Sequence, residues 1–295
     1  MPQKLRFGIA GFGRHAVKRL MPGFASAKSS TVVTALTRRD AKAAAASARE
    51  FGIPHAFSST AEMCRSEEVD AIFVASPDAL HLADVLTAFS HGKHVLCEKP
   101  MAMNADECRQ MIAAAKKAKR LLGVAHIFRF AHSVQHAQSQ VAAGRLGEVS
   151  QARAEFHYWN EGHGRSWIND PGLACGGPIA DVGVHCIDTL RFILQDEVIG
   201  VSATARSDAK SQPMEVSAIM TLEFVKGTLA EVAVSTRAHY RTALELVGAE
   251  GVVSAENGLS VESPVEIRFR ATPSGKANTQ TFSNGDAFTL QANAF

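Results

Sequence analysis

The sequence predicts a chain in two parts, an α/β domain with a doubly wound parallel sheet and an α+β domain with a largely antiparallel open sheet. Short apolar strands alternate with amphipathic helices up to about residue 125, as in a parallel sheet with crossover helices. Strand patterns then follow one another with short turns, which indicates an antiparallel sheet. At roughly 100–200 residues per domain, 295 residues suggest about two domains. We therefore expect domains over residues 1–125 and 126–295.

In the first part, each apolar run is followed by a segment whose apolar residues share one helical face. The predicted strands are 5–10, 31–36, 71–75, 95–97 and 122–126, and the predicted helices are 14–27, 40–51, 80–91 and 104–119. Asn104, with Glu107 three residues later, is a capping pair that predicts the start of the last helix.

In the second part the strand patterns are separated by short turns. The predicted strands are 148–157, 216–224, 228–236, 242–247, 251–255 and 265–270. One helix, 179–194, has clear periodicity, and we expect it to lie on the sheet.

Composition excludes several classes of function. Lysine and arginine number 31 against 29 acidic residues, and the densest basic run, 116–120, closes a predicted helix, where cations offset the helix dipole. No nucleic-acid surface is needed to explain it. No apolar run approaches the roughly 18 residues of a membrane span, and residues 1–20 lack the features of a signal peptide. We expect a soluble protein that binds neither nucleic acid nor membrane.

The cysteines and histidines give no pattern of metal ligands. Five widely spaced cysteines without a CxxC pair argue against a disulfide framework and a zinc site, and they favour the reducing cytoplasm. His132 and His136 share a helix face, but no third ligand is near in sequence, so we interpret them as solvated.

The segment Gly11-Phe12-Gly13-Arg14-His15-Ala16 fits the G-x-G-x-x-[GA] fingerprint of dinucleotide-binding (Rossmann) domains. It follows a predicted strand and opens a predicted helix, which is the required context. Gly11 permits the tight turn, Gly13 lets a pyrophosphate approach the backbone, and Ala16 allows close packing of helix on strand. The alternative is a purely structural glycine turn.

The residues after the second strand bear on which dinucleotide binds. An acidic residue that binds the adenosine ribose is expected there, but the chain has Thr37, Arg38 and Arg39. A hydroxyl and guanidinium groups accept a 2′-phosphate, so NADP(H) is favoured over NAD(H). The alternative is that both arginines are solvated and Asp40 binds the ribose, although Asp40 is better placed as a helix N-cap.

Two further segments follow strands of the parallel sheet, Ser76-Pro77-Asp78-Ala79-Leu80-His81 and Glu98-Lys99-Pro100. Both therefore lie at its carboxyl edge, where open α/β sheets bind ligands. Pro100 restricts the backbone of Lys99 and so limits where that side chain points. Taken alone, a lysine at position 99 would more often be a surface lysine than a site residue.

In the second part, residues 176–185 open the main helix and place Asp181 and His185 on one face. An aspartate that orients a histidine is a usual general acid/base arrangement, although a surface hydrogen bond would explain the pair as well. Residues 157–167 contain both tryptophans and one tyrosine, which suits either a polyhydroxylated ligand or a protein interface.

Together these segments resemble the glucose-fructose oxidoreductase/inositol 2-dehydrogenase/MocA (Gfo/Idh/MocA) family over nearly the whole chain. The matching segments are 8–13, 75–81, 92–100, Arg129-Phe130, and 176–185 with Asp188. Glu98-Lys99-Pro100 combined with the Asp-x-x-x-His helix is the most specific part. Residues 123–129, the aromatic segment with Trp167, and 189–192 look most similar to NADP-dependent 1,5-anhydrofructose reductases and related sugar dehydrogenases.

The resemblance implies hydride transfer between nicotinamide and a secondary alcohol or carbonyl carbon of a sugar or cyclic polyol. Lys99 would hydrogen-bond the reacting oxygen, His185 would exchange its proton, and Asp181 would orient the pair. The expected cofactor, NADP rather than NAD, would contact Gly11, Phe12, Gly13, Arg14, His15, Thr37, Arg38, Arg39, Ser76, Pro77, His81, Glu98, Lys99, Arg129 and Trp167.

The chain departs from the anhydrofructose reductases in places. Ala125 and Ile168 stand where those proteins have an asparagine near the nicotinamide and an arginine after the loop tryptophan. Residues 286–295 look like the start of a longer helix, so we expect a short C-terminus that leaves an apolar groove uncovered.

Two other functions compete with this one. A dinucleotide-binding regulator without activity would have no reason to keep Lys99, Asp181 and His185 together. A redox-neutral, NAD-dependent glycosidase would retain its nucleotide and show no net change at 340 nm. An open sheet in the second part also often supports homo-oligomers.

Overall fold

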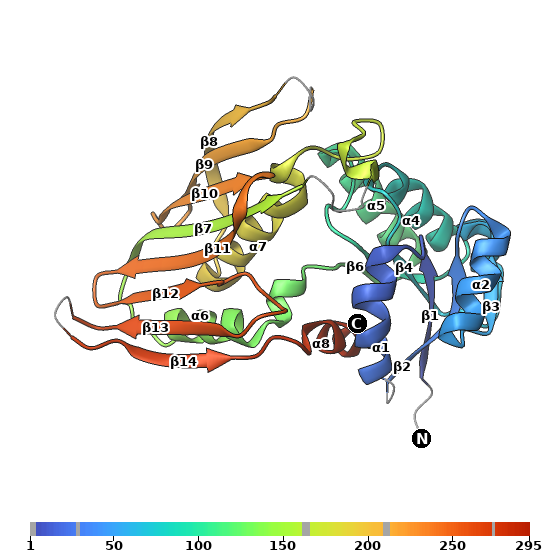
Figure 1. Cartoon of the computed structure of the whole chain (residues 1–295), viewed down its shortest axis with the longest axis horizontal. Coiled ribbons are helices and arrows are strands. Elements are labelled where there is room, and N and C mark those ends of the chain that lie inside the picture. The colour runs from blue at the N-terminus through green and yellow to red at the C-terminus, as the bar shows by residue number, and fades with distance from the viewer. Residues whose placement is uncertain (1–3, 28–29, 161–165, 209–212, 273–274) are drawn as a thin grey trace. The chain divides into compact units, whose positions relative to one another are not determined.

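The computed structural model describes the chain except residues 1–3, 28–29, 161–165, 209–212 and 273–274 (Figure 1). It divides into two compact units. The first comprises Met1–Ala125, Gly172–Cys175 and Phe288–Phe295, and the second comprises His126–Pro171 and Gly176–Ala287. Gly172–Cys175 and Phe288–Phe295 lie within the range 126–295 expected for the second domain, but their contacts group them with the first unit.

The first unit is built on a six-stranded parallel sheet. Its order is β3-β2-β1-β4-β5-β6, so the direction of winding reverses between β1 and β4. The strands are β1 (Leu5–Ala10), β2 (Thr31–Thr37), β3 (His55–Phe57), β4 (Ala71–Val74), β5 (His94–Cys97) and β6 (Leu122–Val124). The predicted doubly wound sheet is confirmed. Only β3 was missed, because three half-exposed residues carry no periodic signal.

Helices connect these strands. They are a helical run that contains a π-helical turn (Ala16–Leu20) and α1 (Met21–Ser26), then α2 (Ala41–Phe51), α3 (Thr60–Cys64), α4 (His81–Ser90) and α5 (Ala105–Ala118). Asn104 caps α5 as predicted, since its Oδ1 accepts the Glu107 N–H at 2.9 Å. The short α3 was not predicted.

The C-terminal helix α8 (Ala287–Ala294) belongs with this core. Phe295 lies 5.7 Å from Phe7 between ring centroids, and Ala292 is buried in the same apolar cluster. Gly23 permits the contact, because a Cβ there would stand 2.7 Å from Cβ of Phe288. The helix expected at the end of the chain is therefore present and packed.

The second unit is built on an eight-stranded sheet in the order β14-β13-β12-β11-β7-β10-β9-β8. Neighbouring strands are antiparallel except β7 and β10, which are parallel. The strands are β7 (Val149–Trp159), β8 (Val198–Arg206), β9 (Ser217–Phe224), β10 (Leu229–Ser235), β11 (Arg237–Gly248), β12 (Val252–Glu256), β13 (Val265–Arg270) and β14 (Asn278–Phe282). The largely antiparallel sheet is confirmed.

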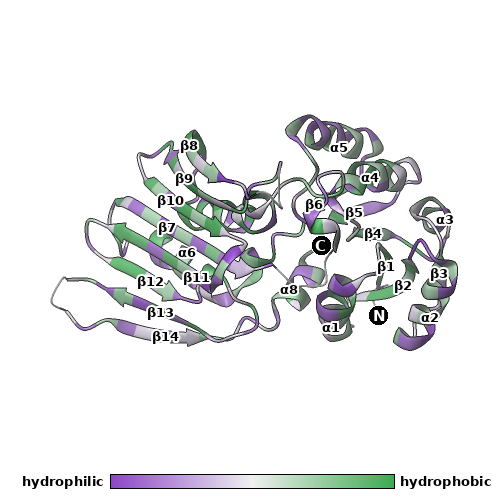
Figure 2. Ribbon diagram, turned by 45° about the horizontal axis from the view of Figure 1, so that its top comes forward, coloured by the Kyte–Doolittle hydropathy of each residue, from purple (hydrophilic) through white to green (hydrophobic). Residues whose placement is uncertain are grey.

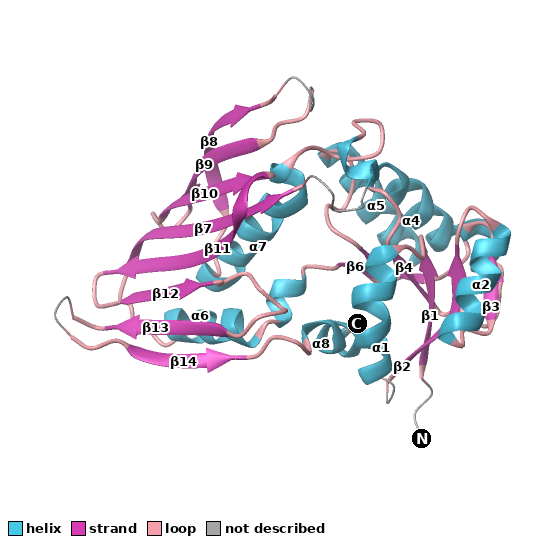
Figure 3. Cartoon of the chain, in the orientation of Figure 1, coloured by secondary structure: helices cyan, strands magenta, loops and turns pink. Residues whose placement is uncertain are grey.

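Two helices lie against one face of this sheet, α6 (His132–Ala142) and α7 (Val184–Leu194), the latter preceded by a π-helical turn, Ile179–Gly183 (Figure 3). From α7, Leu190 and Ile193 are fully buried. Hydrophobic residues are concentrated along the central strands of both sheets (Figure 2). In the parts of the chain that the structure describes, no helix combines the length and apolarity that a membrane crossing needs.

Candidate functional site

The loop after β1 contains two glycines in different environments. Gly11 has φ +80°, and a Cβ there would lie 2.6 Å from the Ser76 backbone. Gly13 is exposed, and a Cβ there would meet only the Gly11 oxygen, at 3.9 Å. Gly11 is therefore required by the protein's own packing, whereas the bare backbone at Gly13 faces open space that a phosphate can fill.

Phe12, between these glycines, turns its side chain away from that space. Its ring is buried and lies 5.4 Å from the ring of Phe51, so only its backbone is available to a ligand. Ala16 is fully buried in the same apolar cluster, as expected for close packing of the helix on the sheet.

Thr37 at the end of β2 supports the glycine loop. Its Oγ1 accepts the Gly11 N–H at 3.1 Å, its carbonyl oxygen accepts the Phe12 N–H at 2.9 Å, and its side chain is buried. The hydroxyl, which was expected to meet a 2′-phosphate, accepts the hydrogen bond that holds the loop. This role depends on a contact across 26 residues of sequence, which spacing alone does not reveal.

The two arginines that follow are exposed. Arg38 donates from Nη1 to Ser47 Oγ at 2.9 Å, so α2 directs its guanidinium. Asp40 caps α2, and its Oδ1 accepts the Ala43 N–H at 2.7 Å. This is the capping role predicted for Asp40. The carboxylate next in sequence to the two arginines is thus engaged by α2.

The loops after β4 and β5 are joined by His81. Its ring is fully buried, with Nδ1 2.9 Å from the Pro100 carbonyl oxygen and Nε2 2.9 Å from the Ser76 carbonyl oxygen. His81, which was expected to contact the cofactor, supports both loops in this way. Ser76 is fixed in turn, because its Oγ donates to Asp84 Oδ2 at 2.7 Å.

Glu98 links the Lys99 loop to the helical run after the glycine loop. Its Oε1 lies 2.8 Å from His15 Nε2, and its Oε2 accepts the Lys99 N–H at 3.2 Å. Burial raises the pKa of Glu98, but the opposing effects of His15 and Lys99 outweigh it and leave the pKa below its ordinary value. His15 and Glu98, expected as separate cofactor contacts, thus form one pair.

A short segment, Gly172–Cys175, attaches to the first unit through the loop of residues 76–81. The Cys175 N–H donates to Asp78 Oδ2 at 3.0 Å, and the Leu173 carbonyl oxygen accepts the Ala79 N–H at 3.1 Å. Asp78 is buried. We call Gly172–Cys175 the strap. No local pattern in the sequence marks it.

In the second unit, Asp181 is buried and accepts a hydrogen bond from Tyr158 Oη, 2.5 Å from its Oδ2. His185 lies one turn further on. Phe128 meets its ring edge-on at 5.0 Å, and Phe156 stacks on it at 6.3 Å between centroids. Sequence reasoning noted Tyr158 as part of an aromatic segment but did not identify it as a site residue.

The helix that carries Asp181 and His185 is capped by Glu215. Its carboxylate accepts the Gly177 N–H at 3.1 Å and the Ile179 N–H at 2.9 Å. A Cβ at Gly177 would lie 1.8 Å from the Glu215 carbonyl oxygen, so only glycine fits there. Glu215 was missed because its partners lie 36 and 38 residues earlier in the chain.

Arg129 forms a bidentate ion pair with Asp188, at 2.9 Å from Nε and 2.6 Å from Nη2. The guanidinium also lies over the Phe192 ring, 5.7 Å from its centroid. The hydrogen bonds that Arg129 donates to Asp188 raise the pKa of Arg129 above its ordinary value. Arg129 was expected to contact the cofactor, and this ion pair accounts for its position without one.

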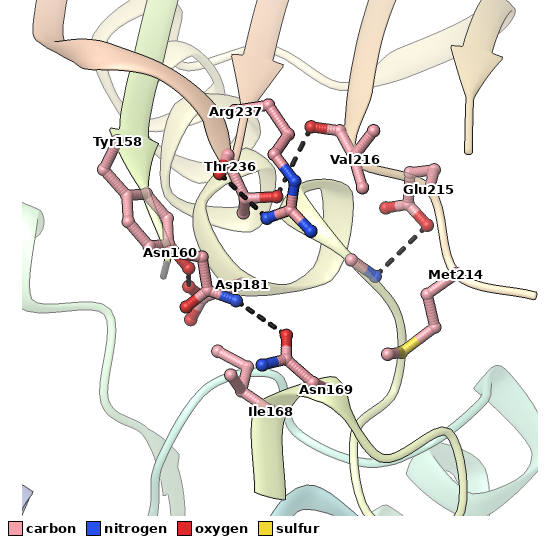
Figure 4. A pocket seen from close by; sticks show the side chains of 11 residues that line it. Tyr158, Asn160, Ile168, Asn169, Asp181, Met214, Glu215, Val216, Thr236 and Arg237 are labelled. Carbon is pink, nitrogen blue, oxygen red and sulfur yellow. Dashed lines mark hydrogen bonds between the residues drawn. The ribbon is translucent and has the colours of Figure 1, made fainter. Parts of the chain in front are cut away.

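A pocket in the second unit lies beside Asp181 (Figure 4). Its lining residues are Tyr158, Asn160, Ile168, Asn169, Gly177, Asp181, Met214, Glu215, Val216, Thr236 and Arg237. Asn160 donates from Nδ2 to Asn169 Oδ1 at 2.7 Å, which ties the end of β7 to the turn Ser166–Asn169 that carries Trp167. Residues 161–165 of the predicted aromatic segment lie outside the described residues.

The three predicted catalytic residues are divided between the units. Lys99 belongs to the first, and Asp181 and His185 belong to the second. Within the described ranges, no group of three or more His, Cys, Asp or Glu residues is arranged to hold a metal ion.

The sequence matches two family models, an oxidoreductase family with an NAD-binding Rossmann fold over residues 5–126 and the GFO/IDH/MocA C-terminal domain over residues 134–254. It is 33% identical to the 1,5-anhydro-D-fructose reductase of Ensifer adhaerens over 79% of this chain and 70% of that protein. It is 27% identical to the D-xylose 1-dehydrogenase (NADP(+)) 2 of Haloferax volcanii over 99% of this chain and 88% of that protein.

Among solved structures, the aldose-aldose oxidoreductase of Caulobacter crescentus superposes with a TM-score of 0.90 at 25% identity, covering 99% of this chain and 89% of that one. The expected fold, family and class of enzyme are thus confirmed. The chain belongs to the Gfo/Idh/MocA family of NAD(P)-dependent oxidoreductases.

Proposed function

We propose that this protein transfers a hydride between NADP(H) and a secondary alcohol or carbonyl carbon of a sugar or cyclic polyol. The observation that carries the proposal is the construction of the helix with Asp181 and His185. Glu215 caps its start, Tyr158 holds Asp181, and two aromatic rings flank His185. A protein that only bound a nucleotide would not need these supports.

The first unit fits a dinucleotide. The open space at Gly13 would accept the pyrophosphate, and the exposed Arg38 and Arg39 would bind a 2′-phosphate. Asp40, the alternative ligand of the ribose, accepts a hydrogen bond from Ala43 and caps α2. These features favour NADP(H) over NAD(H).

When bound, the nicotinamide supplies or accepts the hydride. During reduction, His185 would give its proton to the substrate oxygen, and during oxidation it would take that proton back. Lys99 would donate a hydrogen bond to the same oxygen and stabilise its developing negative charge. Asp181 would keep the His185 ring in the orientation that this proton transfer needs.

The names of the relatives favour a sugar substrate. They are an anhydrosugar reductase, a pentose dehydrogenase and an aldose-aldose oxidoreductase. The pocket beside Asp181 supports this class, because Asn160, Asn169 and Thr236 offer donors and acceptors suited to hydroxyl groups. All five cysteines are free thiols, which fits our proposal of a cytoplasmic location.

The first test is a screen of sugars and polyols at 340 nm with NADPH and with NADH. We expect turnover that His185→Ala lowers by about 10²–10⁴-fold, while His239→Ala, at an exposed histidine of β11, leaves it unchanged. Nucleotide binding without turnover on any substrate would instead support the regulator. A retained nucleotide with glycoside cleavage and no net change at 340 nm would support the glycosidase.

The second test addresses the cofactor. Arg38→Ala should weaken NADPH binding far more than NADH binding, because only NADPH carries the 2′-phosphate. Ser47→Ala removes the hydroxyl that directs Arg38, and we expect a smaller loss in the same direction. Equal losses for both nucleotides would remove the basis for NADP specificity.

A further inference from the structure

Tyr158 and Asp181 form a buried pair, and the reaction proposed above gives the Tyr158 hydroxyl no step of its own. Tyr158 is 6% exposed and Asp181 is 8% exposed, and the Tyr158 hydroxyl donates to Asp181 Oδ2 at 2.5 Å. A neutral phenylalanine would fill the same volume. The hydroxyl therefore needs an explanation beyond packing.

Strand β7 contacts this helix at two points. Phe156 and Tyr158 are two residues apart, so their side chains leave the same face of the sheet. Phe156 stacks on His185, and Tyr158 binds Asp181. Asp181 and His185 are four residues apart and share a helix face. One strand thus aligns both members of the predicted acid/base pair.

The Tyr158 hydroxyl can affect the charge at this site as well as its shape. A hydrogen bond donated to a carboxylate favours the ionised form and fixes the rotation of the carboxylate. The elements packed against His185 present the apolar rings of Phe128 and Phe156, and nearby Arg129 and Asp188 pair with each other. Asp181 and Asp188 both lie on the helical run that carries His185, and of these two Asp188 is paired with Arg129.

We propose that Tyr158 is a positioning residue for catalysis, whose hydroxyl holds Asp181 ionised and oriented so that His185 keeps the proton to be exchanged. This inference rests on the proposed function, since it assigns Tyr158 a role through Asp181 and His185. It distinguishes Tyr158 from a packing residue, because only the hydroxyl, and not the ring, carries the effect.

Tyr158→Phe tests the inference, and Tyr240→Phe is a matched control. These are the two tyrosines of the chain, and Tyr240 is 50% exposed on β11. For reduction we expect Tyr158→Phe to lower kcat about tenfold with the KM for NADPH unchanged. The pH at which kcat falls on the basic side should move down by about one unit, because a less firmly held Asp181 favours the His185 proton less. Tyr240→Phe should match the wild type.

A titration of the histidine rings by NMR separates this inference from the proposed function. It needs no turnover, and the His185 signal is assigned with His185→Asn. In Tyr158→Phe we expect His185 to titrate at lower pH than in the wild type and in Tyr240→Phe. If His185 titrates at lower pH in Tyr158→Phe but no variant turns over any substrate, the proposed reaction is rejected. The effect of the Tyr158 hydroxyl on His185 would still stand. An unchanged His185 titration would overturn the inference.

A double-mutant cycle with Asp181→Asn gives the remaining check. If Tyr158 acts through Asp181, Tyr158→Phe should have no further effect on the His185 titration in the Asp181→Asn background. Equal effects in both backgrounds would show that Tyr158 acts only by packing, and would overturn the inference.

Discussion

Gly11 and Gly13 are two residues apart, and substitution should separate their roles. Gly13→Ala should leave the unfolding temperature of the free protein nearly unchanged, since the added methyl group meets open space. It should weaken nucleotide binding, because we propose that this space receives the phosphates. Gly11→Ala should instead destabilise the free protein, because its φ is +80° and Ser76 stands in the way. Thermal unfolding with and without NADPH measures both effects, and equal NADPH shifts for Gly13→Ala and wild type would contradict the assignment.

Substitution of Asp40 tests whether this residue is a helix N-cap or the ligand of the ribose. If Asp40 is the N-cap, its replacement by alanine should cost about 1 kcal/mol of unfolding free energy, and asparagine should restore most of it. Neither change should alter the preference between NADPH and NADH. If Asp40 were the ribose ligand, Asp40→Asn would weaken NADH specifically. Urea unfolding and nucleotide titrations of the two variants decide between these outcomes.

At the scale of residues, local chemistry was the predictable part. The glycine turn, the Asp40 and Asn104 caps and the buried Ala16 all follow from their immediate neighbours in sequence. The missed features, Thr37 beneath the loop, Tyr158 on Asp181 and Glu215 on Gly177, each join residues more than 20 positions apart. Tertiary pairing of single polar groups leaves no periodic trace in a sequence.

At the scale of elements, the cap on the helix that carries Asp181 and His185 can be tested. Glu215→Ala leaves the Gly177 and Ile179 N–H groups without this acceptor and should lower the unfolding free energy by about 1–2 kcal/mol. Glu215→Gln keeps one oxygen and should lose less. Because the same helix carries Asp181 and His185, kcat should fall in the same order. Unchanged kcat in Glu215→Ala would show that the cap does not position the pair.

The elements missed from sequence share a physical cause. Strands β8 and β14 are the edges of the second sheet, and most of their residues are exposed, so the apolar alternation of a half-buried strand is absent. Helix α6 was noted only as a face shared by His132 and His136. The inner strands β9 and β10 were predicted nearly to their ends, since β9 buries alternate residues and β10 is buried along its last four residues.

At the scale of the whole molecule, buried and paired carboxylates predict a loss of stability in acid. The hydrogen bond from Arg6 lowers the pKa of Asp70. Burial raises the pKa of Glu155, but Arg241, Arg153 and His157 together hold it below its ordinary value. A carboxyl group whose pKa is lower in the folded than in the unfolded protein stabilises the fold. This contribution is fully present above the unfolded pKa of about 4. It should be lost as the pH falls through the folded values. Urea unfolding between pH 7 and 3 measures this, and Arg6→Gln should lower stability at pH 7 and reduce the loss in acid.

The chain passes between its two units four times, after Ala125, Pro171, Cys175 and Ala287. The strap is fixed to the first unit by Asp78, and α8 is packed in the first core. Residues 176–287 of the second unit lie between the strap and α8, so unfolding of the first unit releases both ends of this segment. We therefore expect one cooperative unfolding transition.

NADPH at 100 times its Kd should raise the unfolding free energy of that transition by about 2.7 kcal/mol, and NADH at the same concentration should raise it less. Asp78→Ala removes the hydrogen bond to Cys175, leaves the one between Leu173 and Ala79, and should broaden or split the transition. Calorimetry distinguishes these cases, and two wild-type transitions of which NADPH moves only one would show that the crossings do not couple the units.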